Sequence, residues 1–214
     1  MSDILVSDRL WEKVEPLIPK PRRKNRNVQF AGRKRTDPRK ILNGIVFVLK
    51  TGVPWRHLPK TNDFPSGFTC RRWLLRWHHA GVWKKLSKVL LAELRKQGRL
   101  KFNYAVVDSV SERAPGGGRK TAPNPVDRRK LGTKHHVITD SNGIPLAVIL
   151  TGANRHDITQ LLPLIEALPS VGGKRGRPQK KPKKIYGDRG YDSDPHRREI
   201  KKNGHRTSPR KKKN

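Results

Sequence analysis

The sequence predicts an α+β protein in two parts: an α-helical region to about residue 100, then a region with a mixed sheet. Residues 7–98 carry apolar side chains at helical spacing between capping residues. Beyond residue 100, short β-type runs alternate with loops and with two further helical segments. With 214 residues, the chain has room for one large domain or two small ones and can bury a core.

The charge of the chain indicates a polyanionic partner. Lys and Arg total 50 against 17 Asp and Glu, a formal net charge of +33. Residues 1–100 hold 24 basic and 7 acidic residues, and the remaining residues hold 26 and 10, so both halves are basic. No apolar run is long enough to span a membrane, and the N-terminus lacks the features of a signal peptide. We therefore expect a cytoplasmic, nucleoid-associated protein that binds nucleic acid.

Basic residues are densest in three stretches, 20–40, 174–184 and 201–213. Each contains Pro or Gly, which is typical of solvated loops or arms, and ordered contact with DNA is the alternative. The single cysteine, Cys70, excludes an intrachain disulfide and a cysteine-rich zinc site.

Caps predict the first two helices. Ser7 precedes apolar residues at helical spacing, and Pro19 is predicted to stop that helix. The second helix has Asp37 as its N-cap, continues with Pro38 at the first helical position and ends at Gly52. Its predicted buried stripe is Ile41, Leu42, Ile45, Val48 and Leu49.

Two further helices, 69–79 and 82–98, are predicted on either side of the short turn at Gly81. A helix-turn-helix that binds DNA is one interpretation. A helical bundle that packs its tryptophans is the other, and it is as common. Four tryptophans stand among the apolar helix positions and are predicted to be core residues rather than platforms for bases: Trp55, Trp73, Trp77 and Trp83.

The region beyond residue 100 opens with a β-type run, 104–107, that ends in Asp108, and a Gly- and Pro-rich loop follows to about residue 132. Runs 136–139 and 145–151 flank Asn142-Gly143, a dipeptide that supplies the positive φ angles of a tight hairpin. Asp157 is predicted to cap a helix that reaches Leu168, with Pro163 bending it or delaying its start.

A last strand, 184–187, also ends in an acid, Asp188, and Asp194 with Pro195 caps a helix toward residue 204. Two carboxylates on neighbouring strands repel each other unless a cation neutralises them, and oxygen ligands suit Mg²⁺, with Mn²⁺ as an alternative. Such ions can hold a phosphodiester for cleavage. The alternative is that each Asp is only a turn-former or helix cap, which is commoner.

Two histidine motifs are candidates of lower rank. His135 and His136 follow Lys134 on a predicted strand, where neighbouring side chains point to opposite faces, so a structural or DNA-contacting role is favoured over a shared metal ion. For His156-Asp157, a helix cap explains the aspartate, and both residues are placed outside the catalytic set.

A series of motifs, in order along the chain to about residue 198, resembles the transposases of the insertion-sequence 5 family of bacterial insertion elements. In the N-terminal part they are Leu49, Thr51-Gly-Val-Pro-Trp-Arg56, Leu58-Pro59 and Gly81-Val-Trp83. In the C-terminal part they are Asp108-Ser109, Arg113-Ala114, Gly116-Gly117, Thr121-Ala-Pro-Asn-Pro-Val-Asp-Arg128, Gly132-Thr-Lys-His-His136, Gly143-Ile-Pro-Leu146, Ala153-Asn154, His156-Asp157 and Asp188-Arg-Gly-Tyr-Asp-Ser193.

The resemblance implies a helical DNA-binding region, residues 1–100, and an RNase H-like catalytic domain, residues 101–204, followed by a basic tail, 205–214. It also implies an Asp, Asp, Glu (DDE) triad that uses Mg²⁺ to cut and join DNA. By this match Asp108 and Asp188 are the first and second catalytic carboxylates and metal ligands. The implied partners are double-stranded DNA, as element ends and target, with a homodimer as a candidate assembly.

The third acid of the family has no match in this sequence. The last acid is Glu199, on the helix after Asp188, and it is predicted to be an exposed helix charge. We therefore expect a chain that resembles an insertion-sequence transposase truncated at its C-terminus, with an incomplete RNase H-like domain and weak or absent strand cleavage. The alternatives are an inactive remnant that binds element DNA and a basic nucleoid-type DNA-binding protein.

Overall fold

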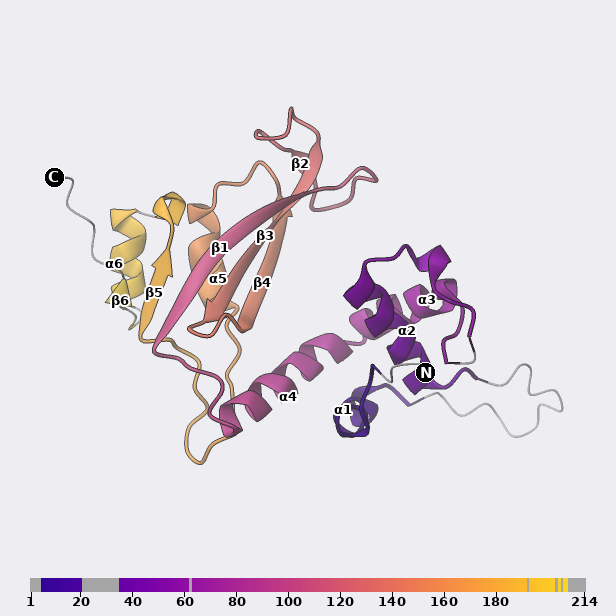
Figure 1. Cartoon of the computed structure of the whole chain (residues 1–214). Helices are drawn as coiled ribbons and strands as arrows, with labels where there is room; N and C mark the ends of the chain where they lie inside the picture. Colours follow the sequence, from indigo (N-terminus) through magenta and orange to yellow (C-terminus); the bar gives the residue numbers. More distant parts are fainter. Residues whose placement is uncertain are drawn as a thin grey trace. The chain divides into compact units, whose positions relative to one another are not determined.

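The structure is a computed structural model that describes residues 5–20, 35–61, 63–191, 193–202, 204 and 206–207. The chain divides into two compact units, Met1–Val89 and Leu90–Asn214 (Figure 1). Residues 21–34 of the first basic stretch and residues 208–214 of the predicted tail lie outside the described residues. Within the described ranges, no helix is long and apolar enough to cross a membrane.

Helices make up the first unit, and the first two of them begin at the predicted caps. In α1 (Asp8–Val14) the Ser7 hydroxyl accepts a hydrogen bond from the Leu10 amide, and α2 (Pro38–Thr51) begins after Asp37. α1 ends before the predicted Pro19, because Pro16 cannot continue the α-helical hydrogen bonds and the chain turns into η1 (Glu15–Leu17). The remaining elements are η2 (Trp55–His57), α3 (Gly67–His79) and the start of α4 (Val82–Lys96).

The core of the first unit forms around Trp77, which is 1% exposed. The ring of Trp77 lies 6.0 Å from that of Trp73 and 5.7 Å from that of Trp83, centroid to centroid, and Trp55 packs against the same cluster. The prediction of a core role is thus confirmed for Trp77, while Trp55, Trp73 and Trp83 are half-buried and pack against this core. The predicted stripe of α2 is buried except for Leu49, which is 68% exposed because it lies at the margin of the stripe in the last turn.

Helix α4 contributes to both cores. Val82 belongs to the core of the first unit, whereas Leu91 belongs to that of the second. The division into units therefore falls within this helix, between Val89 and Leu90, while the composition changes only where the helix ends, near residue 100.

A six-stranded sheet forms the second unit. β1 (Tyr104–Arg113), β3 (Leu131–Asp140) and β4 (Pro145–Gly152) pair antiparallel, with β3 in the middle, and β2 (Ala122–Pro123) also pairs with β3. On its other side β1 pairs parallel with β5 (Lys184–Gly187), and β5 pairs parallel with β6 (Arg206–Thr207). The order β4-β3-β1-β5-β6, with β3 antiparallel to both neighbours, is the sheet of the RNase H-like fold that the resemblance implies.

Two helices and a short turn accompany this sheet: α5 (Ile158–Glu166), η3 (Arg189–Tyr191) and α6 (Asp194–Lys202). α5 lies against one face of the sheet in Figure 1, and its Leu164 is fully buried in the cluster that contains Val107 and Ile138. Pro163 is accommodated inside α5 and does not delay its start.

Three local features differ from the sequence prediction. β1 does not end at Asp108 but continues to Arg113, because β3 pairs with it along its whole length. The hairpin turn has a positive φ only at Gly143, since the Asp140 carboxylate accepts hydrogen bonds from the amides of Asn142 and Ile144 and holds the turn. Residues 206–207 form β6, because parallel pairing uses backbone groups and needs no apolar sequence.

Candidate active site

Asp108 and Asp188 stand at adjacent positions of two parallel strands. In the β1–β5 register, Val107 pairs with Gly187, and an aspartate follows each of these two residues. Neighbouring strands lie about 4.8 Å apart, and residues in register on parallel strands point to the same face. Parallel pairing stops here while β1 runs on beside β3, so Asp108 lies within its strand and Asp188 just past the end of its own.

Backbone groups fix the surroundings of both carboxylates. The Ser109 amide donates a hydrogen bond of 2.7 Å to Asp108 Oδ1. The Tyr191 amide donates one of 3.2 Å to the Asp188 carbonyl, which closes η3. Gly190 lies so near the second carboxylate that a Cβ there would be 3.2 Å from Asp188 Oδ1. The chain therefore turns tightly beneath the Asp188 side chain.

Both carboxylates are exposed, and neither pairs with a cationic side chain in the part of the chain that the structure describes. Two like charges at adjacent strand positions destabilise each other, so this arrangement favours an external cation.

The hydroxyl of Tyr191 is affected electrostatically by three nearby aspartates. It is 6% exposed, and burial raises the pKa of its hydroxyl to about 12, with Asp157, Asp188 and Asp108 also raising it. The Ser109 hydroxyl lowers this pKa, although among the described residues the Tyr191 hydroxyl forms no hydrogen bond of normal geometry. A neutral phenol thus lies near three carboxylates.

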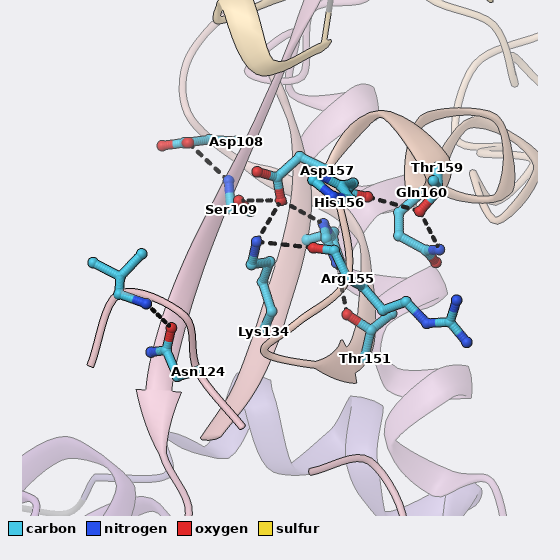
Figure 2. A network of polar contacts seen from close by, with 12 residues as sticks. Asp108, Ser109, Asn124, Lys134, Thr151, Arg155, His156, Asp157, Thr159 and Gln160 are labelled. Atoms are coloured by element: carbon cyan, nitrogen blue, oxygen red, sulfur yellow. Dashed lines mark hydrogen bonds and ion pairs between the residues drawn. The ribbon is translucent and has the colours of Figure 1, made fainter. Parts of the chain in front are cut away.

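Asp157 joins the site from the helix side of the sheet (Figure 2). Its Oδ1 accepts a hydrogen bond of 2.8 Å from the Ser109 hydroxyl and lies 3.2 Å from Lys134 Nζ. The predicted capping role is wrong: Asp157 has helical angles, φ −60° and ψ −41°, and its side chain makes no capping hydrogen bond. A capping side chain needs extended backbone angles, so this carboxylate turns to β1 and β3 instead.

His136 lies fully buried behind this network. Its Nε2 is 2.9 Å from the Thr151 hydroxyl, and its Nδ1 is 3.6 Å from Asp157 Oδ1 without a hydrogen bond. Burial lowers the pKa of His136, although Asp157 opposes the shift, and the charge of Lys134 adds to it. His135, on the other face of β3, lies 3.9 Å from Glu112, so the two imidazoles are separated as predicted.

The residues at the site offer a divalent ion the oxygen donors of Asp108 and Asp188. This donor set suits Mg²⁺ or Mn²⁺, which prefer carboxylates and retain water. The described residues contain no cluster of three or more His, Cys, Asp or Glu side chains placed to hold a metal. Glu199 is exposed on α6, as expected of a helix charge.

Sequence reasoning missed Ser109, Asp157 and Tyr191 as parts of one cluster. The signals were present, because Ser109 adjoins Asp108 and Tyr191 follows Asp188 by three positions. Only the sheet register and the start of α5 bring the three residues together.

Each of the two units matches a family of known proteins. Residues 6–87 match a family model described as "Putative transposase of IS4/5 family", and residues 102–214 match one described as "Transposase DDE domain".

Named relatives agree with these models. The chain is 58% identical over 88 residues to the "Putative transposase for insertion sequence element IS402" of Burkholderia cepacia, an alignment that covers 41% of this chain and 42% of that protein. It is 45% identical over 125 residues to the IS402 uncharacterized 16.2 kDa protein of Burkholderia cepacia, covering 58% of this chain and 84% of that protein. A match of 38% identity over 72 residues links it to the IS1106 transposase of Neisseria meningitidis serogroup B, covering 34% of this chain and 21% of that protein.

The alignments thus span less than half of the two relatives named as transposases. The second family model nevertheless covers the whole sheet of the second unit and both aspartates. With the first model matching the helical unit, the chain belongs to the DDE transposases of the IS4/5 family.

Proposed function

We propose that this chain is an insertion-sequence transposase that cleaves and joins DNA strands, with Asp108 and Asp188 as the ligands of a divalent ion, Mg²⁺ or Mn²⁺. The observation that carries the proposal is the β1–β5 register, which sets the two acids at adjacent positions on parallel strands. The absence of a cationic partner for either acid among the described side chains supports it.

Phosphoryl transfer is the reaction class that this site suits. A divalent ion held by the two carboxylates would supply charge neutralisation for the phosphodiester and an activated oxygen nucleophile. The Ser109 amide orients the Asp108 carboxylate, and Gly190 leaves room for that of Asp188. The proposed sequence is attack by water at the element end, then attack by the freed 3′-hydroxyl on target DNA, with no covalent enzyme intermediate.

Duplex DNA is the proposed partner. The net charge of +33 is spread over both units, which suits neutralisation of a phosphate backbone. In the first unit, α3 and α4 are joined at Gly81, whose φ is 71°, and we propose that this helix pair acts as a helix-turn-helix on element ends. Joining the two ends of an element suits a homodimer. Binding to chromosomal DNA of this kind would make the protein nucleoid-associated.

Strand cleavage by the whole chain tests the proposal. The substrate is a pre-nicked duplex that carries the ends of the element encoding this protein, in Mg²⁺ or Mn²⁺. Asp108→Asn and Asp188→Asn should each remove cleavage, since each change removes a charged ligand. Glu112→Gln is the matched control, because Glu112 is an exposed acid on the same strand, β1.

Equal cleavage by the chain and both Asn variants would contradict the assignment of the two acids. Binding to element ends without cleavage in either metal would instead favour the DNA-binding remnant. Binding without preference for element ends over random DNA would favour the nucleoid-type protein.

A further inference from the structure

The loop between β2 and β3 has an unusual backbone at two consecutive arginines. Arg128 has φ 49° and Arg129 has φ 56°, and within the described ranges they are the non-glycine residues with positive φ. The left-handed region is unfavourable for residues with a Cβ, and glycine adopts it without this cost. A loop selected for shape alone would therefore carry glycine or asparagine at these positions.

Hydrogen bonds close the loop tightly. The Asn124 amide donates to the Lys130 carbonyl at 2.9 Å, and the Arg129 amide donates to the Asn124 carbonyl at 3.0 Å. Asn124 is 8% exposed, and its side-chain oxygen accepts a hydrogen bond of 3.1 Å from the Val126 amide. The backbone of Arg128 and Arg129 is thus set by the loop.

The loop presents two arginines, Arg128 and Arg129, that form no ion pair with a described acidic side chain. Its one acid, Asp127, is bound by two nitrogens of Arg113, at 2.5 and 2.9 Å. Arg128, Arg129 and Lys130 are all exposed, and none forms an ion pair with a described side chain. Val126, 94% exposed, stands beside them.

We propose that the loop Asn124–Lys130, which we call the arginine loop, contacts the phosphate backbone of duplex DNA beside the cleavage site; the inference rests on the proposed function. Strained arginines that pair with no acid among the described side chains fit a polyanion, because guanidinium groups bind phosphate oxygens in pairs. The loop adjoins Arg113, five residues along β1 from Asp108, about 17 Å at the rise of a strand. That span corresponds to contacts within about one turn of the duplex.

The test separates backbone strain from charge. In the whole chain, replacing Arg128→Gly and Arg129→Gly together relieves the unfavourable φ angles and removes two cations. The thermal midpoint of the second unit should hold or rise, while affinity for a 30-base-pair duplex falls. The slope of log affinity against log KCl, measured by fluorescence anisotropy, should become shallower by about 2.

The matched control removes the same charge at the other end of β1. Lys101→Gln with Lys183→Gln replaces two exposed lysines of the same unit. This control should change the salt slope by less than half as much. An equal change in the control, an unchanged slope in the glycine variant, or a loss of stability in that variant would overturn the proposal.

A tethered probe tests contact directly. Cys70 is buried, and burial raises the pKa of its thiol to about 11, so it should not react with a thiol-directed reagent. An iron chelate that attaches to thiols and cuts nearby DNA should therefore label only the cysteine of a Val126→Cys variant. Cuts in the bound duplex should exceed those from a chelate at Lys101→Cys, and equal cuts would contradict the contact. Tighter binding of single-stranded RNA than of duplex DNA through the loop would also overturn it. Failure of the unaltered chain to bind duplex DNA would instead refute the proposed function.

Discussion

At the scale of single residues, Asp157 links three elements of the second unit. Its carboxylate, 27% exposed, accepts a hydrogen bond from Ser109 on β1 and pairs with Lys134 on β3, from the position before α5. Hydrogen bonds to charged groups contribute about 1.5–3 kcal/mol when partly buried. The position therefore couples the strand that carries Asp108 to the helix behind it.

Asp157→Asn should lower the free energy of unfolding of the second unit by about 1.5–3 kcal/mol, because Lys134 loses its carboxylate partner and keeps only the Arg155 carbonyl. Urea unfolding followed by tyrosine absorbance measures this change, since Tyr104, Tyr186 and Tyr191 all lie in that unit. Glu112→Gln, which removes an exposed acid 3.9 Å from His135, should cost much less. A smaller loss for Asp157→Asn than for this control would refute the linking role.

We expect the stability of the second unit to fall at acidic pH because of His136. Burial lowers its folded-state pKa below the ordinary value of 6.5, so the unfolded chain binds the proton more tightly. The contribution of neutral His136 to stability is present above pH 6.5 and declines as the pH falls from there toward the lowered pKa. Urea midpoints at pH 7.5 and 5.5 should differ more for the chain than for His136→Gln, whereas His135→Gln should keep the difference. Equal pH dependence in His136→Gln and the unaltered chain would contradict this.

At the scale of elements, caps and apolar spacing predicted the helices well. Asp37 with Pro38 and the glycine at position 52 are local signals, and α2 begins and ends where they stand. Strand lengths were harder, because a strand extends as far as a neighbour pairs with it. β1 therefore reaches Arg113 through its pairing with β3, and the sequence after Asp108 gives no signal of this extension.

The candidate site likewise has some residues that the sequence could predict and others that it could not. The two acids could be found because each follows an apolar run, and the resemblance matched both. Asp157 was misassigned because the spacing of a helix cap does not reveal backbone angles, and its helical ψ of −41° directs the side chain elsewhere. Tertiary contacts of this kind depend on the register of the sheet and cannot be read from local sequence.

The start of α3 provides a test of packing within the first unit. A Cβ at Gly67 would lie 1.7 Å from the Trp55 carbonyl oxygen, so Gly67→Ala forces α3 and η2 apart. It should destabilise the unit by about 3 kcal/mol. Tryptophan fluorescence during urea unfolding reports on this unit, because all 5 tryptophans lie before residue 90. Gly116→Ala, in open space in the second unit, should leave this transition unchanged, and equal effects would contradict the packing argument.

At the scale of the whole molecule, the net charge of +33 dominates association. If DNA binding neutralises about six phosphates, affinity should fall about 40-fold when KCl is doubled from 0.1 to 0.2 M. Fluorescence anisotropy with duplex DNA measures this fall. An affinity that stays constant over this range would contradict an electrostatic interface.

The central claim is that Asp108 and Asp188 together hold a divalent ion, and Mn²⁺ binding to the whole chain tests it without requiring turnover. Titration followed by electron paramagnetic resonance should show bound Mn²⁺ that is lost in both Asp108→Asn and Asp188→Asn and retained in Glu112→Gln. This result follows from the register that sets the two acids at adjacent positions. Mn²⁺ binding that is unchanged in either Asn variant would contradict the claim.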